Sequence, residues 1–423
     1  MKPGIRYLLL STLALGACSD DSTDPVEVDQ GFAPSVAQVS GMTPRAQLGQ
    51  RIFFDKNLSI GKNQACASCH DPATGFSSPN SDINAHGSVM EGSIPGRFAI
   101  RKPPSAAYAL APALFFDGEA YVGGTFWDGR AKGDKLGNPL ADQALEPFIG
   151  ANEQGLPDLA CVVHRVSISR YAKEYQATWG RQISTISFPA NTDQLCSAEG
   201  NTVPLSPADR AKAVAEYENV ARSIAAFEVS SAVSPFRSRF DAWRHGRGGF
   251  NAQEREGFAL FNGKAQCSAC HPDAGDRAMF TDFTYDNIGV PANLENPALL
   301  ATGFVDRGLG VTLGDPTLDG AQKVPTLRNL DRRAAPGIVK SYMHNGVFKN
   351  LEQVVHFYNT RDVLPACAVP TLPTDPSFGV TCWPAPEVAE NVNVDELGNL
   401  GLTPAEEAAV VAFLRTLSDV PTN

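Results

Sequence analysis

The chain has 423 residues, of which 43% are hydrophobic and 19% charged, and its formal net charge is −11. This composition is typical of globular domains, and the length suggests two or three of them. The acidic balance argues against a nucleic-acid-binding protein and against adhesion to anionic lipids through a basic patch.

The first residues have the layout of an export signal. Lys2 and Arg6 precede an apolar run at residues 7–15, which is too short to span a bilayer and predicts a signal peptide over residues 1–17. No later stretch is long and apolar enough to cross a membrane. We therefore expect a protein of the cell envelope.

The end of this signal indicates a lipid anchor. The sequence Leu-Gly-Ala-Cys at residues 15–18 resembles the lipobox of bacterial lipoproteins, in which the cysteine, here Cys18, is acylated and becomes the mature N-terminus. The resemblance implies a periplasmic protein held at the outer membrane, and an ordinary cleaved leader with a soluble periplasmic protein is the alternative. Residues 18–42 are polar and acidic without periodicity, which predicts a flexible tether.

A first domain is expected over residues 43–232. A helical pattern starts at Thr43-Pro44, and the sequence C-x-x-C-H follows at residues 66–70. Residues 71–125 are rich in Gly, Pro, Ser and Asn, which indicates long loops. An amphipathic helix is predicted over residues 207–228, with a buried face of Val214, Tyr217, Val220, Ala221, Ile224 and Phe227.

A second domain, expected over residues 233–423, repeats this order. Asn251 and Glu254 form a capping-box-like helix start, and a second C-x-x-C-H follows at residues 267–271. Thr403-Pro404-Ala405-Glu406 then begins a closing helix. Strand signals are few throughout, so the sequence predicts an all-α fold with long loops.

The spacing C-x-x-C-H is typical of covalent haem c attachment. In each motif two thiols add to the vinyl groups of the porphyrin and the adjacent histidine ligates the iron from one face. The residues concerned are Cys66, Cys69 and His70 in the first motif and Cys267, Cys270 and His271 in the second. We therefore predict two cytochrome c-like domains, each built round a covalently bound haem c. The residue on the other face of each iron decides between electron transfer, oxygen chemistry and peroxide chemistry.

Four further cysteines are expected to form disulfides, because export leads to an oxidising compartment. They are Cys161, Cys196, Cys367 and Cys382, and three connectivities are open. We favour the local pairs Cys161–Cys196 and Cys367–Cys382, since each closes an excursion rich in Pro, Gly and Thr. Free thiols are the alternative.

An ordered set of landmarks over residues 43–418 resembles the bacterial di-haem cytochrome c peroxidase superfamily, which includes MauG. Besides the two haem motifs, the landmarks are Leu48 to Phe54, Phe126-Trp127-Asp128-Gly129-Arg130, Gln143 with Glu153, Leu327-Arg328-Asn329 and Tyr342-Met343-His344-Asn345-Gly346. The resemblance implies that the N-terminal haem, with His70 as its proximal ligand, has an open sixth position at which hydrogen peroxide reacts.

The resemblance also implies roles for three side chains of the first domain. Gln143 and Glu153, ten residues apart as in the family, would line the distal pocket. A carboxylate within hydrogen-bond reach moves the proton when peroxide is cleaved, and Glu153 is the candidate. Trp127 would lie between the haems as an electron relay. The plain alternatives are a solvated loop acid for Glu153 and a core aromatic for Trp127.

The distal ligand of the second haem, opposite His271, distinguishes branches of the family. In di-haem peroxidases a methionine stands fourteen residues after the histidine of the Tyr-x-His motif, and the same count from His344 leads here to Tyr358. MauG also has tyrosine at this place. A thioether ligand raises the haem potential, whereas a phenolate stabilises oxidised iron. We favour Tyr358 as the ligand, with Met343 as the alternative.

Two further positions are compared with the family pattern. The asparagine that follows an arginine and binds calcium in the family is absent from Arg101-Lys102-Pro103-Pro104, which argues against a bound calcium. His86 lies sixteen residues after His70, as does a removable ligand in some peroxidases, but the differing loop lengths favour a surface histidine.

The resemblance thus implies a peroxide-dependent di-haem oxidoreductase of the MauG type. Oxidising equivalents from hydrogen peroxide would be shared with the His271/Tyr358 haem and used on a partner protein with an oxidisable aromatic residue, or on another donor. The alternative is a cytochrome c peroxidase that takes electrons from a small cytochrome c or a cupredoxin. A pure electron-transfer cytochrome is disfavoured, because a carrier needs no distal acid such as Glu153.

Overall fold

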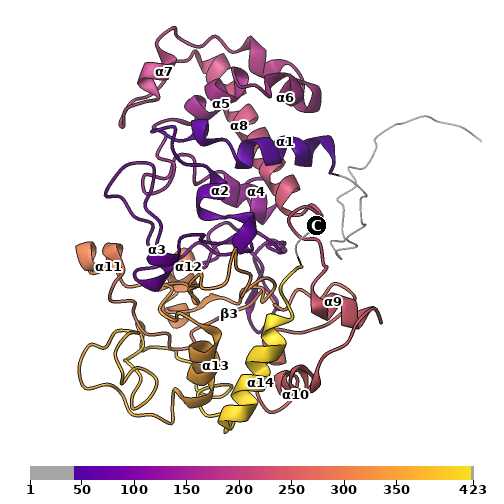
Figure 1. Ribbon diagram of the computed structural model, residues 1–423. Helices are drawn as coiled ribbons and strands as arrows, with labels where there is room; N and C mark the ends of the chain where they lie inside the picture. The colour runs from indigo at the N-terminus through magenta and orange to yellow at the C-terminus, as the bar shows by residue number, and fades with distance from the viewer. Residues whose placement is uncertain (1–41, 421–423) are drawn as a thin grey trace, which may run out of the picture. The chain divides into compact units, whose positions relative to one another are not determined.

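Short helices joined by long loops make up residues 42–420, the part of the chain that the computed structural model describes (Figure 1). The α-helices are α1 (Pro44–Phe53), α2 (Cys66–Cys69), α3 (Ser81–Ala85), α4 (Pro139–Ala144), α5 (Leu159–Ser167), α6 (Ala172–Trp179), α7 (Thr192–Leu195), α8 (Pro207–Glu228), α9 (Arg239–Arg244), α10 (Ala252–Phe261), α11 (Pro297–Thr302), α12 (Leu309–Leu313), α13 (Leu351–Thr360) and α14 (Pro404–Arg415). Single 3₁₀ turns lie at Lys56–Leu58, Pro72–Thr74, Gln182–Thr185, Cys267–Ala269 and Pro316–Leu318.

Strands are few and short in these residues. β1 (Phe115–Phe116) pairs antiparallel with β2 (Tyr121–Val122), with Phe115 opposite Val122. β3 (Tyr285–Asp286) pairs antiparallel with β4 (Gln322–Lys323), with Tyr285 opposite Lys323. The helix-rich content agrees with the predicted all-α class.

The predicted helix starts are formed by the expected capping side chains. Thr43 accepts a hydrogen bond from the Ala46 amide at the start of α1. Reciprocal capping boxes join Asn251 to Glu254 at α10 and Thr403 to Glu406 at α14. Each box satisfies two amides that the helix leaves unpaired, so these boundaries follow from local sequence.

The predicted buried face of α8 is wrong at one position. Val214 is 38% exposed, whereas Ala213 and Glu216 are buried. The Glu216 carboxylate accepts a hydrogen bond from the buried Tyr175 hydroxyl, so the polar Glu216 belongs to the buried face and turns Val214 outward. Apolar periodicity alone does not identify such a paired acid.

Two hydrophobic cores divide the described residues. One core is built from residues 48–233 and the other from residues 240–417. α1 packs on α8 in the first core, and α10 packs on α14 in the second (Figure 1). The division between the cores falls between residues 233 and 240, just after the predicted boundary at residue 232, and the boundaries of the two haem domains stay a prediction.

Both helix pairs cross at a glycine. A Cβ atom at Gly49 would overlap the Ser223 carbonyl and lie 3.0 Å from the Cβ of Phe227. A Cβ atom at Gly257 would overlap the Ala409 carbonyl and lie 2.9 Å from the Cβ of Phe413. The same backbone-to-backbone contact, followed four residues later by a phenylalanine, is therefore used twice.

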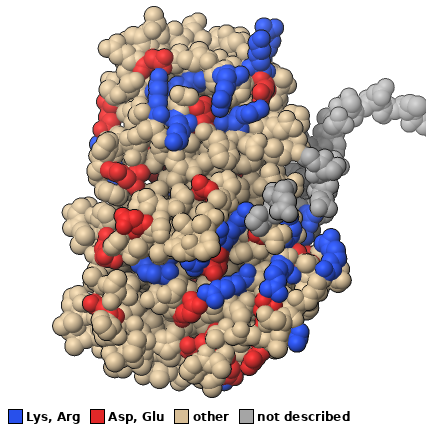
Figure 2. Space-filling model, in the orientation of Figure 1, with Lys and Arg blue, Asp and Glu red and all other residues tan. Residues whose placement is uncertain are grey.

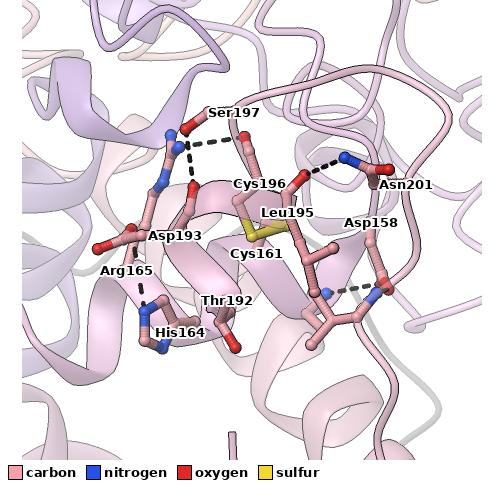
Figure 3. Close-up of a disulfide and its surroundings, with 12 residues drawn as sticks. Asp158, Cys161, His164, Arg165, Thr192, Asp193, Leu195, Cys196, Ser197 and Asn201 are labelled. Carbon is pink, nitrogen blue, oxygen red and sulfur yellow. Dashed lines mark hydrogen bonds and ion pairs between the residues drawn. A yellow bond between two sulfur atoms is a disulfide. The ribbon is translucent and has the colours of Figure 1, made fainter. Parts of the chain in front are cut away.

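The structure contains the two local disulfides favoured from the sequence. Cys161 in α5 is joined to Cys196 at the end of α7 (Figure 3), and Cys367 is joined to Cys382. Beside the first bridge, the Arg165 guanidinium donates to the carbonyls of Cys196, Asn57 and Ser59 at 3.2, 2.7 and 2.6 Å. This guanidinium connects the disulfide-bonded excursion to the loop before the first haem motif.

The predicted signal peptide (1–17), the predicted acylation site Cys18 and almost all of the predicted tether (18–42) lie outside the described residues. Within residues 42–420, no helix is long and apolar enough to span a membrane. On the face shown in Figure 2, acidic and basic side chains are interspersed rather than gathered into a single patch of one sign. This face therefore presents no uniformly basic surface of the kind that binds nucleic acid.

Candidate functional site

Both C-x-x-C-H motifs open onto one cavity of about 700 Å³. Its lining includes the two thiols and the histidine of each motif, that is Cys66, Cys69, His70, Cys267, Cys270 and His271. Their four cysteines are the described cysteines that take no part in a disulfide. The cavity thus brings together all six residues predicted to hold the two haem groups.

The two histidines are held in the same way. His70 Nδ1 lies 3.1 Å from the carbonyl oxygen of Phe76, and His271 Nδ1 lies 2.8 Å from that of Phe280. A carbonyl oxygen can only accept, so Nδ1 carries the proton and Nε2 keeps its lone pair. Phe76 and Phe280 both have left-handed φ angles, 57° and 53°. A matching backbone turn therefore holds each histidine in the way that a predicted iron ligand requires.

The lining suits a group that is apolar with charged edges, as haem is with its two propionates. Most lining residues are apolar, and three lysines line the same cavity, of which Lys340 is buried and Lys102 and Lys323 are half-buried. Burial lowers the pKa of Lys102 to about 8 and the pKa of Lys323 and Lys340 to about 7. A nearby carboxylate would stabilise these ammonium groups. Thiols, oriented histidines and cations together fit two covalently attached haem groups.

Gln143 and Glu153 both line the part of the cavity near the first motif. Burial raises the pKa of the Glu153 carboxyl, with smaller effects of opposite sign from Arg130 and Glu146. No described protein group forms a hydrogen bond with this carboxyl, so it is free to exchange a proton with a ligand in the cavity. Glu153 is half-buried in the cavity wall, and its distal-pocket role stays a prediction.

Gln143 lies in α4, directly after the loop of residues 132–138. The buried Asp142 carboxylate accepts hydrogen bonds from the amides of Gly133, Lys135 and Leu136, at 2.8, 3.1 and 2.8 Å. These bonds fold the loop back onto α4. Gln143, the residue after Asp142, lies in the cavity wall.

Two seven-residue loops, 125–131 and 342–348, share one backbone geometry. An antiparallel bridge closes each loop, and its second and fifth residues have left-handed φ angles. These residues are Phe126 (64°), Gly129 (70°), Met343 (70°) and Gly346 (69°). The third residues are Trp127 and His344, whose ring centroids lie 6.5 Å apart in an edge-to-face arrangement. The loops thus meet at the cavity through their two rings.

The helices after these loops place the predicted distal groups. Loop 125–131 leads to α4, which packs on α8, and loop 342–348 leads to α13, which packs on α14. Gln143 in α4 and Tyr358 in α13 therefore hold corresponding places in the two halves, and both line the cavity. Burial, together with Cys270 and Cys267, raises the pKa of Tyr358 above its ordinary range. Met343 also lines the cavity, so both candidate ligands lie in its wall.

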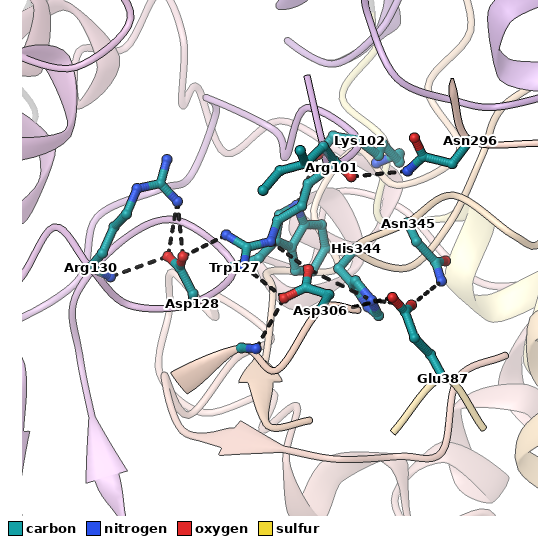
Figure 4. Close-up of polar contacts among 12 residues, drawn as sticks. Arg101, Lys102, Trp127, Asp128, Arg130, Asn296, Asp306, His344, Asn345 and Glu387 are labelled. Carbon is teal, nitrogen blue, oxygen red and sulfur yellow. Dashed lines mark hydrogen bonds and ion pairs between the residues drawn. The ribbon is translucent and has the colours of Figure 1, made fainter. Parts of the chain in front are cut away.

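A chain of ion pairs surrounds Trp127 (Figure 4). The Arg101 guanidinium donates to Asp128 at 2.6 Å and to Asp306 at 2.5 and 2.7 Å. Asp128 also accepts from Arg130, and His344 Nε2 lies 3.4 Å from Glu387. Burial alone would raise the pKa of Asp306, but the bonds and charge of Arg101 together with His344 hold it well below its usual range.

Hydrogen bonds to the backbone of Lys102 also connect the loops that carry Trp127 and His344. Trp127 Nε1 donates to the Lys102 carbonyl at 2.9 Å, and the Lys102 amide donates to the His344 carbonyl at 2.8 Å. Sequence reasoning did not identify Arg101 and Asp306 as a pair, because 205 residues separate them. One sequence feature did point to this region. The segment Arg101-Lys102-Pro103-Pro104 lacks the asparagine that binds calcium in the family, which also argues against a calcium site. In the described residues no group of three His, Cys, Asp or Glu side chains is arranged to hold a metal ion, and the expectation on calcium stays a prediction.

His86 lies away from this site. It is exposed at the end of α3, and its Nδ1 lies 2.9 Å from the Asp82 carbonyl oxygen. It does not line the cavity. This placement agrees with the favoured interpretation of a surface histidine.

Comparisons with known proteins agree with this site. Residues 43–248 match the family model described as di-haem cytochrome c peroxidase. The chain is 33% identical over 386 residues to the methylamine utilization protein MauG of Paracoccus denitrificans, covering 88% of each chain. It is 27% identical over 403 residues to the cytochrome-c peroxidase IdrP2 of Denitromonas iodatirespirans, covering 91% of this chain and 84% of the relative. The crystal structure of the diheme peroxidase BthA from Burkholderia thailandensis superposes with a TM-score of 0.69 at 28% identity, covering 91% of this chain and 88% of BthA.

Proposed function

The chain belongs to the di-haem cytochrome c peroxidase family and is a peroxidase-type oxidoreductase, and we propose that it uses hydrogen peroxide to oxidise a partner protein, as an enzyme of the MauG type. Family membership implies two haem c groups. When bound, these groups supply the redox chemistry, which no side chain of the chain can provide alone. The remaining steps are binding, orientation and proton transfer, and they fall to residues that line the cavity.

The role proposed for each residue follows from its position in the cavity wall. His70 and His271, each with Nε2 unprotonated, would ligate the two irons, and Cys66, Cys69, Cys267 and Cys270 would attach the porphyrins. The Glu153 carboxyl accepts a proton from one peroxide oxygen and returns it to the other, which makes the second a better leaving group. Gln143 orients the bound peroxide. Trp127 carries electrons between the two sites.

The observation that carries the proposal is an asymmetry at equivalent places. After the repeated loop, the first half presents Gln143 with the half-buried acid Glu153 in the cavity wall, whereas the second half presents Tyr358. An acid suits a site where peroxide is cleaved. A tyrosinate ligand stabilises oxidised iron and suits a site that stores an oxidising equivalent. Such storage allows slow oxidation of a protein at a distance.

A second candidate function is peroxide reduction with electrons from a small cytochrome c or a cupredoxin. Met343 supports it, because a thioether in place of Tyr358 would raise the potential of the second haem. The relative IdrP2, named a cytochrome-c peroxidase, also supports it. A pure electron carrier would leave the Glu153 carboxyl in the cavity wall without a role.

Replacing the tyrosine separates these candidates. In Tyr358→Met the ferric spectrum of the second haem should change and its reduction potential should rise, whereas Met343→Leu should alter neither. The reverse pattern would assign the ligand to Met343 and favour the peroxidase. Wild-type protein mixed with one equivalent of peroxide, without donor, should keep both oxidising equivalents long enough to record spectra; their immediate loss would refute storage.

We further propose that the protein is exported and held at the outer membrane through acylated Cys18. The two disulfides support this, since such bonds form in oxidising compartments. Labelling cells with a radioactive fatty acid should mark the wild-type protein and not Cys18→Ala. Equal labelling of both would exclude this anchor.

A further inference from the structure

One ion pair lies in the wall of the haem cavity that Glu153 also lines. Arg130 Nε donates to the Glu146 carboxylate at 2.8 Å, and both residues belong to the cavity lining. No step of the proposed reaction uses either of them. Fixed charges in the wall of a reaction site act on any proton that moves there, so this pair has a bearing on the peroxide chemistry.

The guanidinium of Arg130 is held by three groups. It lies 3.6 Å from the centre of the Phe126 ring and donates to both carboxylate oxygens of Asp128 at 3.0 Å (Figure 4). The third group is the Glu146 carboxylate. Asp128 also accepts from Arg101, within the chain of ion pairs around Trp127. Arg130 therefore has a fixed position and joins that chain to the cavity wall.

A tight turn brings Glu153 back to Glu146. The Gly150 amide donates to the Glu146 carbonyl at 2.9 Å, and the Glu153 amide donates to the Gly150 carbonyl at 2.9 Å. A Cβ atom at Gly150 would lie 2.9 Å from a Glu153 carboxyl oxygen and 3.2 Å from the Glu146 carbonyl oxygen. The Glu153 carboxyl is thus folded over Gly150 toward the residue that pairs with Arg130.

The two charges act on this carboxyl with opposite signs. Burial is the largest cause that raises the pKa of Glu153; beyond burial, the charge of Arg130 lowers this pKa and the charge of Glu146 raises it. Two more acids, Glu91 and Glu228, line the cavity and stay unchanged in the experiments below. The Arg130–Glu146 pair therefore contains one charge that favours the carboxylate and one that opposes it.

We propose that Arg130 and Glu146 are positioning residues of the peroxide reaction, whose paired charges set the pH at which the Glu153 carboxyl can accept a proton. The inference rests on the proposed function, in which Glu153 carries the proton while peroxide is cleaved. A catalytic base works best when its pKa lies near the working pH. Arg130 keeps burial from holding the carboxyl protonated, and Glu146 keeps Arg130 from making it too weak a base.

Removing the two charges one at a time gives opposite predictions. In Arg130→Met, which keeps an apolar side chain against Phe126, the rise of the peroxide rate constant with pH should move to higher pH, because Glu153 loses a cation that favours its charged form. In Glu146→Gln the same rise should move to lower pH, since a repelling charge is gone. Stopped-flow mixing of the holoenzyme with hydrogen peroxide, without donor, measures both profiles.

Three controls accompany these variants. Arg130→Lys keeps the positive charge and should keep a profile close to that of the wild type. Lys264→Met breaks an ion pair of similar exposure, 43% and 22% against 39% and 32%, that does not line the cavity, and should leave the profile unchanged. In a Glu153→Gln background, Arg130→Met and Glu146→Gln should shift nothing, because the titrating carboxyl is gone.

A second readout does not depend on turnover. The infrared C=O stretching band of a protonated carboxyl disappears as the group ionises, and the band that Glu153→Gln removes belongs to Glu153. Its loss with rising pH should move to higher pH in Arg130→Met and to lower pH in Glu146→Gln. If Arg130→Met prevents haem incorporation because Asp128 loses a partner, Glu146→Gln and Arg130→Lys, which both keep a cation beside Asp128, carry the test.

The outcomes separate the inference from the function on which it rests. A wild-type protein that does not react with peroxide refutes the proposed function, whereas the infrared titration measures the effect of the two charges in either case. Midpoints that stay unchanged in Arg130→Met and Glu146→Gln, or that move in the same direction, refute the inference alone and leave the pair as a structural contact. A shift in Lys264→Met as large as that in Arg130→Met also refutes it, since the effect would then be one of net charge.

Discussion

Gly257→Ala tests the helix crossing on which the second haem half is built. The added Cβ would lie 2.5 Å from the carbonyl carbon of Ala409 and 2.9 Å from the Cβ of Phe413. Favourable carbon–carbon contacts lie at about 3.5–4.0 Å, so α10 and α14 must separate by roughly 1 Å. Overpacking of this size costs about 1–3 kcal/mol, and the strained contact here is backbone on backbone, where no rotamer change can relieve it.

Helix propensity alone predicts that Gly257→Ala stabilises the protein rather than destabilising it. In an exposed helix, alanine is more stable than glycine by about 0.8–1.0 kcal/mol, so a tolerant crossing would make Gly257→Ala stabilising. We expect a net loss of about 1–3 kcal/mol, which corresponds to a fall in Tm of roughly 2–12 °C for a unit of this size. Thermal unfolding of the holoprotein followed by circular dichroism measures this shift.

Gly249→Ala is the matched control. It lies in the same half, and a Cβ at this position would meet nothing within 4 Å. Its Tm should stay within about 2 °C of the wild type, as for most surface substitutions. A Gly257→Ala variant as stable as the wild type, or more stable, would show that the two helices do not meet backbone to backbone and would refute the repeated crossing.

Two further predictions concern buried charge. Because burial raises the pKa of Glu153, its carboxyl stays protonated, and unable to accept a proton, to a higher pH than an ordinary acid. The peroxide rate constant should therefore rise with pH through a range above 4.5, and Glu153→Gln should be slow at every pH; a wild-type profile flat across this range would contradict the assignment. Arg328 and Asp241 form an ion pair at 2.7 Å with side-chain exposures of 0% and 1%. Asp241→Ala should lower the free energy of unfolding by about 3–5 kcal/mol because the buried guanidinium loses its partner. Removing the exposed Arg415 should cost less than about 1 kcal/mol in the same denaturant titration, and equal losses would contradict this.

Local sequence was sufficient for the helix starts and the haem motifs. Capping boxes at Asn251 and Thr403 act within one turn, so their residues suffice to place α10 and α14. The C-x-x-C-H spacing is likewise a local requirement of the porphyrin. The short disulfides follow the same logic, since nearby cysteines form the smallest loops.

The sequence did not show which side chains are buried because a distant polar group pairs with them. Val214 was placed inside because it fits the apolar period, but the bond between Glu216 and Tyr175 decides which side of α8 is buried. Gln154 shows the converse. Its sequence resembles a solvated loop, and only the fold buries its carboxamide without a partner.

The sequence by itself identified the groups that the predicted chemistry needs. They are two thiol pairs with adjacent histidines, a candidate acid and a candidate tyrosine ligand, each recognisable from residue type and spacing. Tertiary structure alone decided how these groups meet. It brought Trp127 and His344 within 6.5 Å, from loops more than two hundred residues apart, and enclosed them with the ion pairs of Arg101. The physical reason is that covalent attachment and capping depend on neighbours along the chain. Ring contacts, buried ion pairs and glycine crossings depend on which surfaces exclude water together, and no local pattern records that.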